Sequence, residues 1–195
     1  AVERDLTMAT TAALDTAKVN RLLASAPGAA AAMLLEAARA DQAPAQAWLG
    51  QLYLDGRGVT RDTGEALYWF QRAAHAGVPM AMNMLGRCYE NAWGCTADYA
   101  LAEVQADQAK AFELYRRSAE GGDYRGLCSW ASVLHGRGDS EAAARLLRRA
   151  IPLAPAHYLG PLAAGLCASG SALLVAVADE AEARLQNMVA PVCPP

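Results

Sequence analysis

The side chains that could bind a metal ion or catalyse a reaction are few and widely spaced in this sequence. The three histidines, His75, His135 and His157, have no second ligand at the spacing of a zinc site, and neither an H-E-x-x-H nor a C-x-x-C motif occurs. A zinc site needs three or four converging ligands. We therefore expect structural roles for these side chains, with no metal and no cofactor bound.

One cluster has the residue types of a nucleophilic triad. Ser132, His135 and Asp139 fall close together, at a predicted helix end and in the turn that follows it. No G-x-S-x-G nucleophile elbow marks the serine, and serine and aspartate near helix ends commonly cap the helix or bind solvent. We therefore expect a protein that is not an enzyme, and we keep a serine or cysteine hydrolase as a remote alternative.

The five cysteines are an odd number, so they cannot all pair within the chain. Residues 1–5 are charged and no apolar segment follows them, which is unlike a secretory signal. We therefore expect buried free thiols in a reducing compartment, and a cytoplasmic protein. Export stays open because the chain does not begin with Met, and in an exported protein Cys88 and Cys95 could form a disulfide.

Charge and hydropathy argue against nucleic acid and membrane as partners. The formal net charge is −3, and the arginines are scattered among the acids, so no basic stripe could neutralise phosphates. Residues 158–178 carry no charge and are long enough to cross a bilayer. However, the segment contains several Gly and Ser residues, and Ser169-Gly170-Ser171 is typical of one helix ending and another beginning.

Internal repeats reveal the elements that must position these side chains. Leu49-Gly50-Gln51-Leu52-Tyr53 recurs 36 residues later as Leu85-Gly86-Arg87-Cys88-Tyr89, and Ala74-His75-Ala76-Gly77 recurs 45 residues later as Ala119-Glu120-Gly121-Gly122. The longer second shift indicates an insertion between Trp93 and Gln108. Such periods are typical of stacked structural units.

Each unit has the apolar spacing of two helices joined by a turn. Glycines at 56 and 58 permit the positive φ that ends a helix, Asp62 or Thr63 can cap the next helix, and the Gly-Arg-Gly at 136–138 is interpreted as a similar turn. Gly50 and Gly86 lie inside helices, which indicates close contact with a neighbouring helix. The predicted helix pairs are 8–24 with 28–41, 44–55 with 63–76, 79–91 with 108–120, 124–135 with 139–150, and 158–168 with 171–188.

The first complete unit has a recognisable pattern, L-G-x-x-Y-x-x-G-x-G-V-x-x-D followed by E-A-x-x-W-F-x-x-A-A-x-x-G. It strongly resembles the Sel-1-like repeat family, a relative of tetratricopeptide repeats that is common in bacteria. The resemblance covers about residues 40–155 and weakens in the third unit, which drifts towards a tetratricopeptide pattern. Its framework residues are Leu49, Gly50, Tyr53, Gly56, Gly58, Trp69, Ala73, Ala74, Gly77, Leu85, Gly86 and Tyr89.

The resemblance implies an all-α fold, a right-handed α-α superhelix of antiparallel helix pairs with about ten helices in one continuous solenoid. We divide it into a degenerate N-terminal pair (1–43), a first clear repeat (44–78), a second repeat (79–123) with an inserted loop (93–107), a short third repeat (124–156), and C-terminal capping helices with a tail (157–195). The capping helices are expected to cover the last apolar face.

The resemblance also implies an adaptor that binds a partner protein or peptide on its concave face, as a monomer or a weak homodimer. The alternative is an accessory subunit that docks on an enzyme. By analogy with tetratricopeptide geometry, eight side chains are expected to line the concave face, although they could equally form an ordinary solvated surface. They are Gln51, Leu54, Asn83, Arg87, Glu90, Arg125, Ser132 and His135.

Overall fold

The computed structural model describes residues 16–91, residue 93 and residues 108–189, and the structural statements that follow refer to these residues. They form ten α-helices and no β-strand. In chain order these are α1 (Thr16–Ser25), α2 (Pro27–Arg39), α3 (Ala43–Asp55), α4 (Thr63–His75), α5 (Pro79–Asn91), α6 (Gln108–Glu120), α7 (Tyr124–Gly136), α8 (Ser140–Ala150), α9 (Ala156–Cys167) and α10 (Ala172–Val189).

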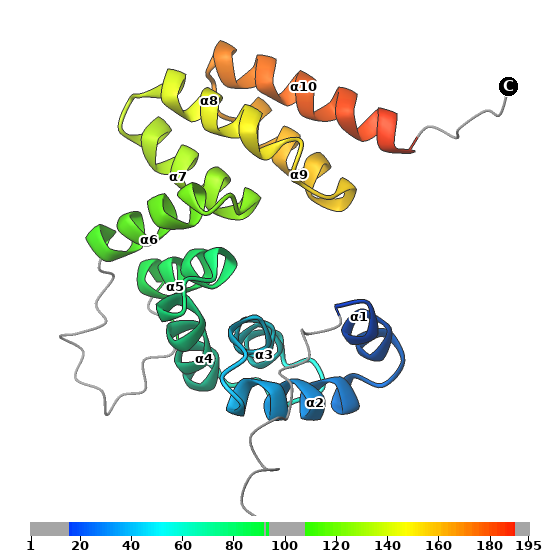
Figure 1. Ribbon diagram of the computed structural model, residues 1–195. Helices are drawn as coiled ribbons and strands as arrows, with labels where there is room; N and C mark the ends of the chain where they lie inside the picture. Colours follow the sequence, from blue (N-terminus) through cyan, green and yellow to red (C-terminus); the bar gives the residue numbers. More distant parts are fainter. Residues whose placement is uncertain (1–15, 92, 94–107, 190–195) are drawn as a thin grey trace, which may run out of the picture.

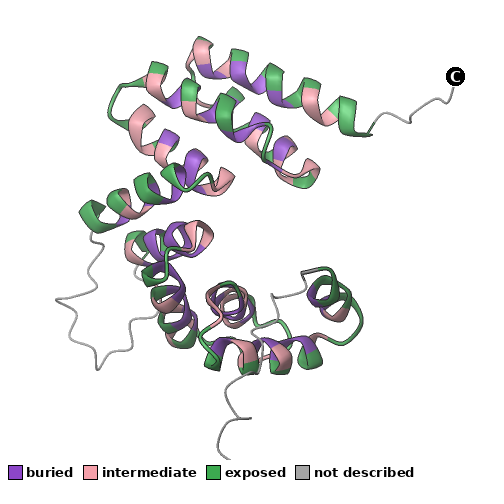
Figure 2. Ribbon diagram, in the orientation of Figure 1, coloured by how far each residue is buried: buried purple, intermediate pink, exposed green. Residues whose placement is uncertain are grey.

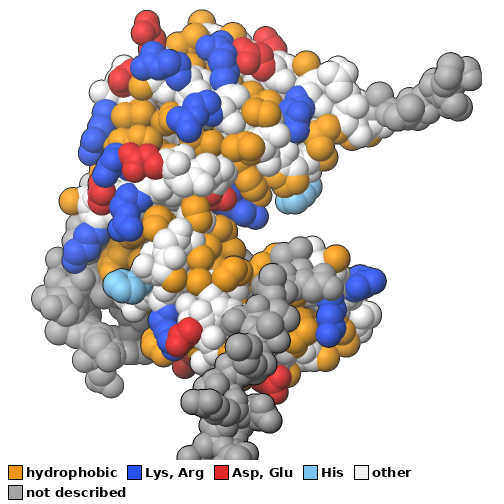
Figure 3. Space-filling view, viewed as in Figure 1, with side chains coloured by type: hydrophobic (Ala, Val, Ile, Leu, Met, Phe, Trp, Pro, Cys, Tyr) orange, Lys and Arg blue, Asp and Glu red, His pale blue; other side chains and the backbone are white. Residues whose placement is uncertain are grey.

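From α1 to α8 each helix packs against the next, α5 also contacts α7, and α10 packs on both α8 and α9. Figure 1 shows the successive helix pairs following an open arc, with α1 near one end and α9 and α10 at the other. Helices α1, α3 and α9 lie towards the inside of the arc, whereas α2 and α10 lie on the outside. The space-filling view in Figure 3 shows the hollow that the arc encloses. The expected all-α solenoid of about ten helices is therefore confirmed.

The helix boundaries agree closely with those expected, and proline chemistry explains two of the differences. α2 begins at Pro27, and α3 has Pro44 in its first turn; a proline there fixes a helical φ where its missing N–H is not needed. The predicted helix 8–24 corresponds to α1, and its first half lies outside the described residues. Residues 158–178 divide into α9 and α10, with Gly170 at φ 73° between them.

The buried side chains form four clusters along the arc and no central core. Each cluster draws its buried residues from consecutive helices: α1 to α4, α3 to α5, α6 to α8, and α7 to α10. Figure 2 shows the same pattern, with buried residues where helices face their neighbours and exposed residues on the outer surfaces. Each helix pair therefore completes its core with apolar side chains from adjacent pairs, as in other repeat proteins.

The glycines inside helices bring paired helices together. A Cβ on Gly50 would lie 2.9 Å from the Phe70 ring, and a Cβ on Gly86 would lie 2.7 Å from the Tyr115 ring. The two contacts are equivalent, because one aromatic residue of each second helix packs against the helical glycine of its first helix. The close approach expected from the sequence is observed in both repeats.

Turns and caps also follow the repeat. Gly56 ends α3 at φ 68°, and Asp62 caps α4 by accepting hydrogen bonds from the backbone N–H groups of Gly64 and Glu65. Gly77 has φ 89° in the turn after α4. Asp41 takes the corresponding position one repeat earlier at φ 58°, so an aspartate occupies a site where the repeat has glycine.

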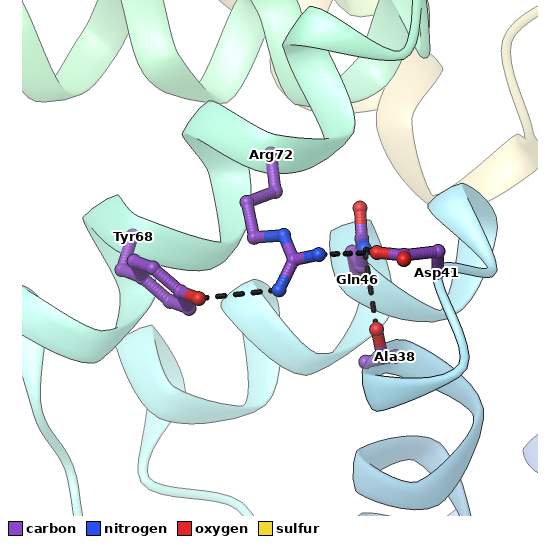
Figure 4. Close-up of polar contacts among 5 residues, drawn as sticks. All are labelled: Ala38, Asp41, Gln46, Tyr68 and Arg72. Carbon is purple, nitrogen blue, oxygen red and sulfur yellow. Dashed lines mark hydrogen bonds and ion pairs between the residues drawn. The ribbon is translucent and has the colours of Figure 1, made fainter.

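Asp41 is held there by a polar network between α2, α3 and α4 (Figure 4). Its carboxylate accepts a charged hydrogen bond from Arg72, whose guanidinium also donates to the Tyr68 hydroxyl at 3.1 Å. The buried Gln46 amide donates to the Ala38 carbonyl at 3.2 Å and lies 3.4 Å from the Asp41 carboxylate. The network holds the turn in place. It also gives hydrogen-bond partners to the Gln46 amide, which would destabilise the fold if it were buried without them.

Candidate partner-binding surface

Seven of the eight side chains expected on the concave face are at least partly accessible, but they do not form one site. They come from α3 (Gln51, Leu54), α5 (Asn83, Arg87, Glu90) and α7 (Arg125, Ser132, His135). Arg87, Glu90 and Ser132 line one pocket, and Ser132 and His135 line a second. Gln51, Leu54 and Arg125 line neither of these two pockets.

Asn83 differs from the expectation. Its residue surface is 1 % exposed, and its Oδ1 accepts a hydrogen bond of 2.8 Å from the Ser129 hydroxyl of α7. An asparagine in this position satisfies a buried polar contact between α5 and α7 instead of facing solvent. The tetratricopeptide analogy misplaced it because α5 and α7 pack directly against each other.

The first pocket, which we call the arginine pocket, lies between α5, α6 and α7 and has a volume of about 400 Å³. One arginine comes from α5 and the other from the turn after α7, and α6 contributes two aromatic rings. The lining residues are Arg87, Glu90, Phe112, Tyr115, Ser129, Ser132, Val133, Gly136 and Arg137.

The one carboxylate among the described residues of the arginine pocket, that of Glu90, already has a hydrogen-bond partner within the protein. The buried Tyr115 hydroxyl donates a 2.7 Å hydrogen bond to the Glu90 carboxylate. Burial first, and this bond second, raise the pKa of Tyr115 above its usual value, so the phenol stays protonated and remains a donor. Glu90 is thereby tied to the wall of the pocket.

The two arginines of the pocket pack on aromatic faces. The Arg87 guanidinium carbon lies 5.4 Å from the centroid of the Trp93 ring. The Arg137 guanidinium carbon lies 4.9 Å from the Phe112 ring and 6.0 Å from the Trp130 ring. Such stacking stabilises a guanidinium while leaving N–H donors in its plane for an anionic group.

The second pocket, which we call the apolar pocket, lies between α7 and α9 and has a volume of about 390 Å³. Its floor reaches Leu147 of α8 and Leu174 of α10. The lining residues are Cys128, Ala131, Ser132, His135, Leu147, Tyr158, Pro161, Leu162, Gly165, Leu166, Ser169 and Leu174.

Three polar side chains that line the apolar pocket have partners of their own. The Ser169 hydroxyl donates to the Leu166 carbonyl at 2.6 Å, and Nδ1 of His135 lies 2.9 Å from the Ser140 hydroxyl. Burial raises the pKa of the Cys128 thiol to about 11, against the weaker opposing effect of its hydrogen bond with Tyr158. The cysteine is therefore a neutral wall of the pocket and a poor nucleophile at neutral pH.

The structure does not assemble the triad considered from the sequence. His135 pairs with Ser140, and Asp139 caps α8 by accepting a hydrogen bond from the Ala142 backbone N–H at 2.9 Å. In the described residues no hydrogen bond joins Ser132 to His135 or His135 to Asp139. Asp139 is used to cap a helix and His135 contacts a different serine, so neither is placed to activate Ser132.

Two further features of the described residues bear on function. They contain no group of three or more His, Cys, Asp or Glu side chains that could hold a metal ion. None of the helices in the described ranges has the length and apolar character needed to cross a membrane. The Cys88–Cys95 bridge considered above lies outside what the structure describes, because Cys95 is not among the described residues.

Several pocket residues could not be singled out from the sequence. Tyr115 could have been found, because at the 45-residue shift it aligns with Phe70, the phenylalanine of the W-F pair in the repeat pattern. Arg137 was interpreted only as part of a turn, and the apolar lining from α9 belongs to a segment without a repeat pattern. For Arg137 and the pocket residues of α9, neither residue type nor spacing shows which other helices they contact.

The stacked antiparallel pairs and their serial cores define an α-solenoid repeat protein. The sequence profile of the Sel1 repeat matches residues 43–78, 79–103 and 103–123. Residues 43–123 therefore consist of Sel1 repeats, as the framework residues predicted.

One solved structure supports the fold. The chain is similar to a Sel1 repeat protein from Oxalobacter formigenes, with 23 % sequence identity and a TM-score of 0.55, over 82 % of this chain and 64 % of that one. A protective antigen of uropathogenic Escherichia coli strains, which displays an SLR fold, aligns with 22 % identity and a TM-score of 0.35 over 83 % of this chain and 41 % of its own. The chain thus spans less than two thirds of the length of either protein. No curated protein matches the chain.

Proposed function

We propose that this protein is a non-enzymatic, cytoplasmic scaffold that binds a segment of a partner protein along the inner surface formed by α5, α7 and α9. Sel1 repeats generally serve as protein–protein interaction scaffolds, which makes a protein partner the natural expectation. The observation that carries the proposal is that the arginine pocket and the apolar pocket adjoin at Ser132, an exposed residue of α7.

The chemistry of this surface supports a protein ligand. It combines charged, aromatic, hydroxyl and aliphatic side chains in two adjoining pockets that are lined by residues of α5 to α10. Mixed surfaces of this kind suit the backbone and varied side chains of a polypeptide. Arginine and aromatic residues, which line the first pocket, are also the residue types that most often dominate binding energy in protein interfaces.

The test is affinity capture from lysate of cells that naturally produce the protein, comparing the wild-type chain with Ser132→Arg. An arginine at this position would cover the mouths of both pockets, so we expect the captured amount of the partner to fall at least about tenfold, a loss of roughly 1.4 kcal/mol. Mass spectrometry identifies the partner, and would also reveal whether it is an enzyme.

The matched control is Ala183→Arg, which adds the same charge to an exposed position of α10 outside both pockets. It should capture the partner normally, and both variants should keep the wild-type melting temperature. A partner that binds equally well to Ser132→Arg would contradict the proposed surface.

A further inference from the structure

We propose that the two pockets recognise an acidic side chain and a neighbouring large apolar side chain of one extended partner segment. This inference deepens the proposed function and depends on it, because it specifies the chemistry of the partner at the same surface. It follows from three observations: the arginines of the first pocket have no acidic partner among the described residues, leucines line the apolar pocket, and Ser132 lines both pockets.

The arginines of the first pocket have no acidic partner in the described part of the chain. Arg72, Arg116 and Arg148 pair with carboxylates at the surface. In the same described ranges, neither Arg87 nor Arg137 has a carboxylate within 4.0 Å or donates a side-chain hydrogen bond. Their guanidinium planes rest on aromatic rings, which orders the side chains before a ligand arrives.

The charge balance of the arginine pocket favours an anion. Two guanidinium groups face one carboxylate, and that carboxylate already accepts the Tyr115 hydroxyl. A guanidinium presents a planar fork of N–H donors that matches a carboxylate. The pocket is therefore complementary to a side-chain carboxylate, or to the terminal carboxylate of a peptide.

The apolar pocket favours a different side chain. Leu147, Leu162 and Leu174 line it, and its His135 and Ser169 groups are engaged by Ser140 and by the Leu166 carbonyl. A charged or amide side chain placed among these leucines would lose hydration and find few polar partners, which is unfavourable. A leucine, methionine or aromatic side chain would gain buried apolar contact instead.

Ser132 places the two pockets side by side on the surface of α7. The arginine pocket uses the face of α7 that carries Ser129, Ser132 and Val133, whereas the apolar pocket uses the face with Cys128, Ala131 and Ser132. Consecutive side chains of an extended peptide point in opposite directions, roughly perpendicular to its path. One segment that crosses α7 at Ser132 can therefore direct nearby side chains into both pockets.

The experiment is a display selection of random peptides of about twelve residues, which extend to roughly 40 Å, on the immobilised full chain. We expect the enriched peptides to share an acidic residue within a few positions of a large apolar one. Failure to enrich any peptide, or enrichment without this pair, would overturn the inference.

Two sets of variants assign each preference to its pocket. Arg87→Gln with Arg137→Gln should lower the affinity of a selected peptide about tenfold or more and remove the selection for acidic residues, while the apolar preference remains. Gly165→Leu should fill the apolar pocket and remove the apolar preference, since a Cβ at Gly165 meets no atom within 4 Å and the helix can accept it.

The matched control is Arg145→Gln with Arg149→Gln, which removes the same charge from exposed positions of α8 outside both pockets. This variant should select the same peptides as the wild type, and melting temperatures show that every variant is folded. If the cellular partner bound the pocket variants with unchanged affinity, this inference would fail while the scaffold function could still stand.

Discussion

At the scale of single residues, the repeat is held together by a few contacts that recur from one unit to the next. Gly50 meets Phe70 and Gly86 meets Tyr115 in the same geometry. Tyr115 occupies in the second repeat the position of Phe70 in the first, and its added hydroxyl donates a hydrogen bond to Glu90. A residue that only packs in the first repeat therefore also lines a pocket in the second. One added polar atom thus lets a packing position of the repeat also shape a pocket.

Trp69 is the framework residue with the largest expected contribution to stability. It is 5 % exposed in the cluster between α1 and α4, and its indole N–H donates to Glu65 at 3.0 Å. We expect Trp69→Ala to lower the free energy of unfolding by about 3–5 kcal/mol, because it leaves a large cavity. Chemical denaturation monitored by circular dichroism measures the change.

Tyr68→Ala is the control for this prediction. Tyr68 is the neighbouring aromatic residue, is 47 % exposed and makes an edge-to-face contact with Trp69. Its removal should cost about 1 kcal/mol or less. Equal losses for the two variants would show that Trp69 does not anchor the core.

At the scale of the helices, α7 is the element on which the proposed surface depends. It packs on α6 through Gly126, where the buried Ser118 of α6 donates a 2.6 Å hydrogen bond to the Pro79 carbonyl. Its other faces line the two pockets. By contrast, α9 carries Pro161 in its interior, and its Gly165 has open space around it.

The same substitution should therefore have opposite effects in α7 and α9. Gly126→Ala should destabilise the protein by about 1–3 kcal/mol, because the added Cβ would lie 2.2 Å from the Ser118 hydroxyl oxygen. Gly165→Ala should stabilise it by about 0.5–1 kcal/mol, because alanine favours helix and meets no neighbour. Thermal denaturation of the two variants provides the comparison, and a shared sign would contradict the packing described for α7.

At the scale of the whole molecule, the clusters at the two ends of the arc have no buried residue in common. The N-terminal cluster contains Leu34 and the C-terminal cluster contains Leu159, both fully buried. Stability in such an array is approximately a sum of unit and neighbour terms. Local opening at one end should therefore have little effect on the other.

We expect Leu34→Ala to increase amide hydrogen exchange in α1 to α3 while α9 and α10 keep their protection. The substitution removes about 2–5 kcal/mol of core stability, and its effect should fade along the series of helices. Hydrogen exchange measured by mass spectrometry resolves the helices, with Leu159→Ala as the reciprocal control. A uniform loss of protection along the chain would indicate a single cooperative unit instead.

The helix pairs, their turns and their framework contacts could be predicted because they depend on local properties. Apolar periodicity defines which face of a helix is buried, and the glycines at 56 and 77 mark turns that need positive φ. The close contacts at Gly50 and Gly86 could also be predicted, because glycine destabilises a helix interior and a closely packed neighbouring helix offsets that cost. Each of these features is encoded within one repeat unit.

The proposed binding surface depends on how neighbouring units are offset from one another. Residue types and their spacing do not give this offset. Asn83 occupies a position expected to face the hollow, yet the contact between α5 and α7 buries it. Arg137 follows α7 in a turn, yet it reaches the Phe112 ring of α6. The pattern of the sequence thus determined an all-helical repeat protein, whereas the packing angles between helices decided which side chains meet, because pockets form from residues of different units.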